Sequence, residues 1–171
     1  NFGTMTKPLH AGLAARNGVL AALLAAEGFT AADAAIDGAQ GFVAAASDAG
    51  PDAMAAFDDL GTRWEIVRTG VTVKLYPSCA ATHPPLDALL DLRRQHGFGR
   101  DDVAAIDVAV DTVTPSVLIY SDPQTGLEAK FSLQFCAAAG AAFRHLGIDT
   151  FDHSVVRGQA IPPLAGRRSV A

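Results

Sequence analysis

The chain has 171 residues, a formal net charge of -5 and 50% hydrophobic residues, which suits one globular domain or two small ones. The balance is mildly acidic, and the longest basic groups are the pairs Arg93–Arg94 and Arg167–Arg168. A nucleic-acid partner is therefore not expected. No stretch looks apolar enough to span a bilayer, because "GVLAALLAAEG" is too short and carries Glu27.

The two cysteines, Cys79 and Cys136, lie far apart and belong to no CxxC motif. We expect free thiols in a reducing cytoplasm. An iron–sulfur cluster needs about three protein thiolates, which two cysteines cannot supply. HExxH and paired metal-ligand motifs are also absent from the sequence, so we expect chemistry without a metal.

Residues 1–62 are predicted to be helical. "LHAGLAARNGVLAALLAAE" (9–27) is rich in strong helix formers and is followed by Gly28. Shorter helices are predicted at 30–37, around "AQGFVAAAS", and over "PDAMAAFDDLG" (51–61). The chain begins at Asn1 without a signal-peptide pattern, and we expect it to be a piece of a longer polypeptide.

The amino-acid composition of the sequence changes at Trp64. "WEIVRTGVTVKLYP" (64–77) is rich in β-branched and aromatic residues, which predicts two short strands or one bent strand. A leucine stripe predicts a helix over 84–95 that stops before Gly97, alternation predicts a strand over 103–110, and a third helix is predicted over 127–145. This order favours an α+β domain at 63–171 joined to a helical domain at 1–62.

The stretch "TMTKPLHAG" sets Lys7 and His10 around Pro8, which suits the first turn of a helix. A cation there is electrostatically unfavourable unless an anion is shared with the free N–H groups. One interpretation is a solvated lysine and a histidine that packs by chance. The other is an anion site.

A second stretch, "VKLYPSCAATHPP", repeats the arrangement with Lys74 and His83 before another predicted helix, where Thr82 is a candidate cap. An edge-strand lysine and a flanking histidine would explain each residue separately. Two such instances together favour a ligand with two or three carboxylates, with lysine and histidine available for proton transfer. Tyr76 and Cys79 are weaker candidates for the same pocket, because their residue types and positions favour a structural role for both side chains.

Three blocks, "KPLHAGLAARNGVLAALLAAEGFT", "VKLYPSCAATHPPLDALLDL" and "GLEAKFSLQFCAAAGA", resemble in the same order characteristic blocks of the MmgE/PrpD family. That family includes 2-methylcitrate dehydratase, cis-aconitate decarboxylase and iminodisuccinate epimerase. The resemblance implies the end of a large helical domain followed by a smaller α+β lid domain, with the active site between them. It also implies a homodimer and no metal or organic cofactor.

By this resemblance the active-site lysine and histidine of the first block fall on Lys7 and His10, and those of the second block on Lys74 and His83. We predict catalytic roles for Lys7, Lys74 and His83, and substrate-binding roles for His10, Tyr76 and Cys79.

The implied function is a cytoplasmic, cofactor-independent lyase of the dehydratase type acting on a small di- or tricarboxylate such as 2-methylcitrate. An epimerase or decarboxylase of the same family is an alternative. A carboxylate-binding or dimerisation module without catalysis is another. The family also draws catalytic residues from upstream helices that are not in this sequence.

Overall fold

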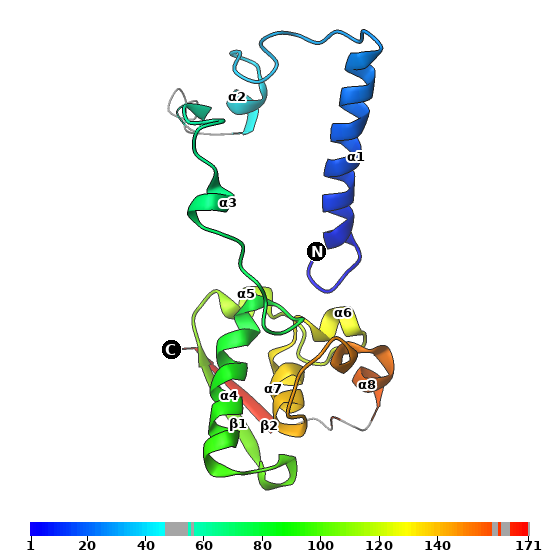
Figure 1. Cartoon of the computed structure of the whole chain (residues 1–171). Coiled ribbons are helices and arrows are strands. Elements are labelled where there is room, and N and C mark those ends of the chain that lie inside the picture. The colour runs from blue at the N-terminus through cyan, green and yellow to red at the C-terminus, as the bar shows by residue number, and fades with distance from the viewer. Residues whose placement is uncertain (47–54, 56, 159–160, 162–164, 171) are drawn as a thin grey trace. The chain divides into compact units, whose positions relative to one another are not determined.

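Helices are the main elements of the chain. Its computed structural model describes all residues except 47–54, 56, 159–160, 162–164 and 171 (Figure 1). The chain forms two compact units, one of Asn1–Ala11 with Lys74–Ala171 and the other of Gly12–Val73. The predicted α+β class, with a helical domain over 1–62 and a lid over 63–171, stays a prediction.

Helix α1 spans Thr6–Ala26 and is followed by Gly28 with a φ of 83°, which confirms the first predicted helix and starts it three residues earlier. None of its residues is buried within this chain. Contrary to expectation, the helix is long and apolar enough to cross a membrane by length and composition alone, with a mean hydropathy of 1.3. Core helices of soluble proteins and signal sequences pass the same test. Arg16 lies midway along α1, where it would cost about 2.5–3.5 kcal/mol in a bilayer, which weighs against a membrane span.

The second unit contains the short helix α2 (Phe42–Ala46), as predicted. The helix predicted at 30–37 is wrong, because those residues form separate turns. Isolated backbone hydrogen bonds, such as Gly38 N–H to Ala34 O and Phe42 N–H to Ala35 O, are present instead of the continuous series that a helix would have. All of 30–37 is exposed, and a short helix without packing is marginal in water. The helix predicted at 51–61 lies partly outside the described residues.

The strands predicted at 64–77 are also wrong. Residues Glu65–Arg68 form the helical turn α3, held by Arg68 Nε and Nη2 donating to the Glu65 carboxylate at 2.6–3.1 Å. Residues 69–77 adopt no strand. A strand needs a neighbour to pair its backbone. The described residues provide none here, and the β-branched side chains stay exposed, Val67 at 82%.

The core of the first unit forms where α4 (His83–His96) packs on α7 (Leu133–Ala142). The helix predicted at 84–95 is confirmed, and Gly97 ends it in the left-handed conformation at φ 71°. Gly140 permits the close approach of the two helices, because a Cβ there would lie 3.1 Å from methyl groups of Leu86 and Leu89. The core cluster consists of Leu86, Ala129, Phe135, Cys136, Ala139, Leu146 and Phe151.

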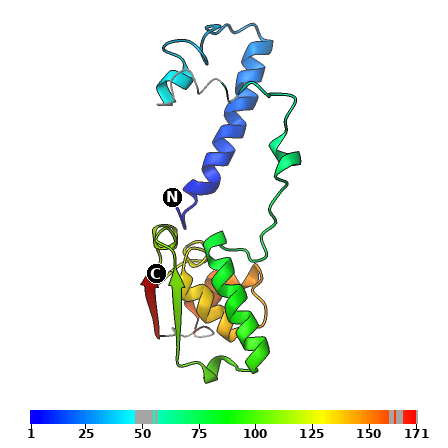
Figure 2. The same ribbon diagram turned by 90° about the vertical axis from the view of Figure 1, so that its left-hand side faces the viewer.

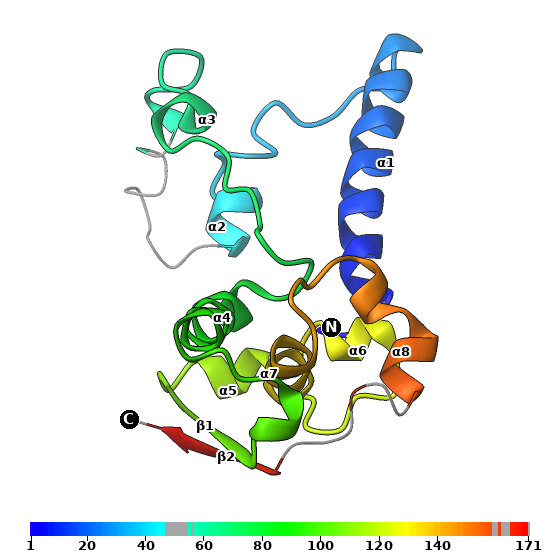
Figure 3. The same cartoon turned by 60° about the horizontal axis from the view of Figure 1, so that its bottom comes forward.

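A two-stranded parallel sheet lies beside these helices, which occupy the same side of it (Figures 2 and 3). Strand β1 (Ala105–Val110) pairs with β2 (Ala165–Val170) in a register that sets Ala105 opposite Ala165. Strand β1 confirms the predicted alternation, because its residues are alternately exposed and half-buried. Strand β2 was not predicted.

The helix predicted at 127–145 is divided in two. Helix α6 (Gly126–Ala129) and helix α7 are separated by Lys130–Ser132. Each has its own cap, because Thr125 Oγ1 accepts from Glu128 N–H and Ser132 Oγ accepts from Phe135 N–H. Within the described residues, the short elements that were not predicted include η2 (Ala80–Thr82), η3 (Arg100–Asp102), α5 (Thr114–Val117), η4 (Asp149–Phe151) and α8 (His153–Arg157).

Candidate functional site

The turn between α6 and α7 joins the three sequence blocks. The Cys79 N–H donates to Lys130 O at 2.9 Å, which ties the second block to the third. The Tyr120 N–H donates to Phe131 O at 3.3 Å. The Phe131 ring lies 5.3 Å from the Phe2 ring, so the residues just before the first block reach the same turn. Residues separated by more than 120 positions therefore meet at one place.

Lys7 is held at this turn by aromatic rings rather than by a carboxylate. Its Nζ lies 5.1 Å from the centre of the Phe2 ring and 4.9 Å from that of Phe131, within the range of cation–π attraction. No ion pair engages Lys7 within the described part of the chain. The two rings therefore favour one position of an ammonium group whose hydrogen-bond donors stay available for another acceptor.

The residues before α1 are fixed to the same unit. Tyr120 Oη donates to Phe2 O at 2.9 Å, and buried Gly3 lies against the Tyr120 ring with a φ of 71°. A Cβ on Gly3 would lie 2.5 Å from Tyr120 Cε2. Glycine is needed here for both its conformation and its small size. This contact was not predicted, because nothing local in "VLIYSDP" points to residues 2 and 3.

The second block folds on itself through side-chain hydrogen bonds. Lys74 Nζ donates to Ser78 O at 2.8 Å. Thr82 Oγ1 donates to Cys79 O at 2.7 Å and lies 2.7 Å from Ser78 Oγ. A hydroxyl has one proton, so Ser78 is the donor in that second bond. The expectation that Thr82 caps the helix is wrong, because its side chain makes no cap bond and bonds back to residues 78 and 79.

His83 begins α4 and contacts Tyr76. Their rings meet edge to face at 5.2 Å and 85°, and Tyr76 Oη donates to Asp87 Oδ1 at 2.6 Å. Burial, together with the hydrogen bond and the charge of Asp87, raises the pKa of Tyr76 to about 12. The phenol is therefore a neutral donor at physiological pH. The buried Nε2 of His83 has no hydrogen-bond partner among the described residues.

Some of the predicted site residues contact each other, and others contact residues of the third sequence block. Tyr76 contacts His83 directly, Lys7 reaches Phe131, and Cys79, which is half-buried, bonds to Lys130. Among the described residues no hydrogen bond or ion pair links Lys7 to Lys74, and His10 is exposed on α1. The sequence analysis did not single out Phe131, Tyr120 or Asp87, which position these residues.

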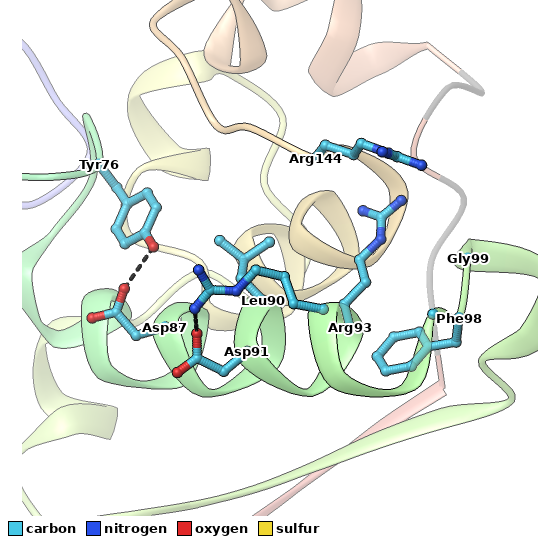
Figure 4. Close-up of a pocket in the computed structure, with 10 residues that line it drawn as sticks. Tyr76, Asp87, Leu90, Asp91, Arg93, Phe98, Gly99 and Arg144 are labelled. Atoms are coloured by element: carbon cyan, nitrogen blue, oxygen red, sulfur yellow. Dashed lines mark hydrogen bonds and ion pairs between the residues drawn. The ribbon is translucent and has the colours of Figure 1, made fainter.

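Within the described ranges, no group of three or more His, Cys, Asp or Glu side chains is placed to hold a metal ion. A cavity of about 660 Å³ lies along α4 (Figure 4). Of the predicted site residues it includes Tyr76 alone.

Comparison with known families decides the affiliation. Residues 1–54 match the MmgE/PrpD N-terminal domain, and residues 76–171 match the MmgE/PrpD C-terminal domain. The chain belongs to the MmgE/PrpD family. The predicted domain boundary at 62/63 falls between the two matched ranges.

Among characterised MmgE/PrpD proteins, cis-aconitate decarboxylase of Mus musculus is 27% identical over 157 residues. The alignment covers 88% of this chain and 31% of the relative. The chain thus spans about a third of the length of that curated relative.

The two matched ranges contain five of the six predicted site residues. Lys7 and His10 fall in the N-terminal match, and Tyr76, Cys79 and His83 fall in the C-terminal match. Lys74 lies two positions before the C-terminal match begins. The contacts at Lys130 and Phe131 therefore join residues of the two MmgE/PrpD domains within the unit that contains them both.

Proposed function

We propose that the full-length protein is a lyase that acts on a small di- or tricarboxylate without a cofactor. Membership of the MmgE/PrpD family and the similarity to a cis-aconitate decarboxylase support this proposal. The structural observation that carries it is the junction at residues 130–131. There the Lys7 ammonium and the segment from Lys74 to His83 are tied to one turn. The ammonium groups of Lys7, from the first block, and of Lys74, from the second, could then each bind one carboxylate of the same substrate.

In the proposed mechanism a base removes a proton from the carbon α to a carboxylate, and the electron pair moves into that carboxylate. The His83 imidazole is the candidate base, since its Nε2 has no hydrogen-bond partner among the described residues. Lys7 and Lys74 stabilise the negative charge that develops. Tyr76, kept as a neutral phenol, packs against the His83 ring in an edge-to-face contact that positions it.

The leaving group then determines the reaction. Loss of hydroxide from the neighbouring carbon, with a proton supplied to it, gives the dehydratase reaction that we propose for a 2-methylcitrate-like substrate. Decarboxylation is the second candidate, and the name of the mouse relative favours it. In that case the base removes no α-proton: a carboxylate leaves as CO2, the electron pair of the broken bond stays on the carbon skeleton, and that skeleton takes up one proton. Reprotonation on the opposite face would give an epimerase.

The assembly and location remain part of the proposal. We propose a cytoplasmic homodimer in which residues 63–171 belong to an α+β lid domain and residues 1–62 to the end of the helical domain. A carboxylate-binding module without turnover would share the same cationic groups. Turnover by the full-length protein distinguishes the two.

The test is a substrate panel of 2-methylcitrate, cis-aconitate and aspartate-derived acids on the full-length protein. We expect turnover of one tricarboxylate and a fall in kcat of about 10²-fold or more in His83→Gln, which is typical for removal of a general base. The control is Arg68→Gln, which loses only exposed pairing with Glu65 and is expected to keep full activity. Ligand binding without turnover of any acid in the panel would refute the lyase in favour of the binding module.

A further inference from the structure

A second feature of this unit is the cavity along α4, which is lined by several arginine side chains. The cavity of about 660 Å³ is lined by Tyr76, Leu90, Asp91, Arg93, Phe98 and Arg144, among others. Its volume is in the range of small-molecule sites. Figure 4 shows Arg93 and Arg144 at one end of the cavity, and Tyr76 with Asp87 at the other.

Arg93 is fixed by the end of α7. Its Nη1 donates to Gly140 O at 3.2 Å and to Phe143 O at 2.6 Å. These bonds cap the carbonyl end of the helix and use only the two protons of one nitrogen. A guanidinium has five N–H donors, so Nε and Nη2 of Arg93 retain three. The side chain is half-buried, which holds these remaining donors in a fixed orientation.

Arg144 follows Phe143, whose carbonyl Arg93 binds, and lines the same cavity. Over the described ranges of the chain, no hydrogen bond or ion pair engages the Arg144 guanidinium. Two guanidinium groups at one end of a cavity repel each other unless an anion lies between them. Their planar forks suit the oxygen atoms of a carboxylate or phosphate.

The acidic residues of the cavity do not supply that anion. Asp87 accepts the hydrogen bond of Tyr76, and Asp91 forms an ion pair with Arg94, one turn along the same helix. Both carboxylates are therefore engaged by neighbours other than Arg93 and Arg144. The charge of the cavity at its arginine end remains positive.

We propose that this cavity binds a small molecule bearing a carboxylate or phosphate group, with the oxyanion held by Arg93 and Arg144. Leu90 and Phe98 provide apolar surface for the rest of the ligand. The cavity differs from the site assigned to catalysis in its charged residues, because none of Lys7, Lys74 and His83 lines it. Tyr76 belongs to both, since its hydroxyl faces Asp87 in the cavity and its ring contacts His83.

The test is calorimetric titration of the full-length protein with inorganic phosphate, ribose 5-phosphate and citrate. Arg144→Gln removes the charge without breaking any described contact and is expected to weaken binding of the recognised anion by about tenfold or more, through loss of charge-assisted hydrogen bonds. The matched control is Arg157→Gln on α8, whose arginine bonds to Gln124 outside the cavity. This control is expected to bind as the wild type does.

The three probes distinguish the two sources of the oxyanion. Binding of phosphate or ribose 5-phosphate that depends on Arg144 identifies a phosphorylated ligand, and such binding of citrate alone identifies a carboxylate. Lys74→Gln separates this proposal from the proposed lyase, since it is expected to leave the Arg144-dependent binding unchanged. Equal affinity of wild type and Arg144→Gln for every probe, or no binding of any probe up to about 10 mM, would overturn the proposal.

Discussion

The contact of Lys7 with Phe131 links the first sequence block to the turn at residues 130–131. A double-mutant cycle measures the coupling free energy of this contact. The variants are Lys7→Met, Phe131→Leu and the pair, each in the full-length protein. Lys7 is exposed, and its Nζ lies 4.9 Å from the Phe131 ring. A cation–π contact at an exposed site contributes about 0.5–1 kcal/mol, so we expect a coupling free energy of that size.

The assay is urea unfolding followed by circular dichroism, with the free energy of unfolding obtained by linear extrapolation. Phe131→Leu alone is expected to cost more than the coupling energy, because it also loses the ring contact with Phe2 at 5.3 Å, worth about 0.5–1.5 kcal/mol.

The matched control replaces Lys7→Met by Lys74→Met in the same cycle. Lys74 Nζ bonds to Ser78 O and is expected to show coupling to Phe131 within about 0.3 kcal/mol of zero. Equal coupling of both lysines to Phe131, or none for Lys7, would refute the proposed position of the Lys7 ammonium.

Two further predictions concern the same unit. Gly3→Ala is expected to destabilise the protein by about 1–3 kcal/mol, because the residue has a φ of 71° and a Cβ would overlap the Tyr120 ring; an unchanged melting temperature would contradict this contact. Burial raises the pKa of the Cys136 thiol to about 12, so iodoacetamide at pH 8 should modify half-buried Cys79 well before Cys136, as read by mass spectrometry. Because the folded pKa lies above the ordinary value of 9.0, the stability gained by keeping this thiol neutral is complete below about pH 9 and is lost as the pH rises toward 12. Faster modification of Cys136 than of Cys79 in the folded protein would contradict its burial.

Elements with a strong local signal could be predicted from the sequence. Helix α4 has its leucine stripe and a left-handed Gly97 at its end, and β1 alternates along its length. The strands predicted at 64–77 were wrong because β-branched residues favour a strand only where a neighbour pairs with it, and the described residues offer no such neighbour. The division of the helix at 127–145 depended on Ser132, whose capping bond to Phe135 N–H competed with helix continuation.

Long-range contacts could not be predicted in the same way. Strand β2 pairs with β1 across more than 50 residues, and the local sequence of neither strand indicates which segment pairs with it. The sequence picked out Lys7 and Lys74 by their position before helices. It did not show that Phe131 would lie under the Lys7 ammonium, because that contact depends on how α6 and α7 are folded together.

The most direct test of the proposed carboxylate site is the melting temperature of the full-length protein with and without citrate. A ligand at 100 times its Kd stabilises the folded state by about 2.7 kcal/mol, which gives a clear upward shift. Because citrate is also a candidate ligand of the cavity along α4, the shift is measured in Arg144→Gln, and in that background Lys74→Ala is expected to abolish it. An undiminished shift in the double variant would contradict the account that the lysines of the two blocks hold the carboxylates of the substrate.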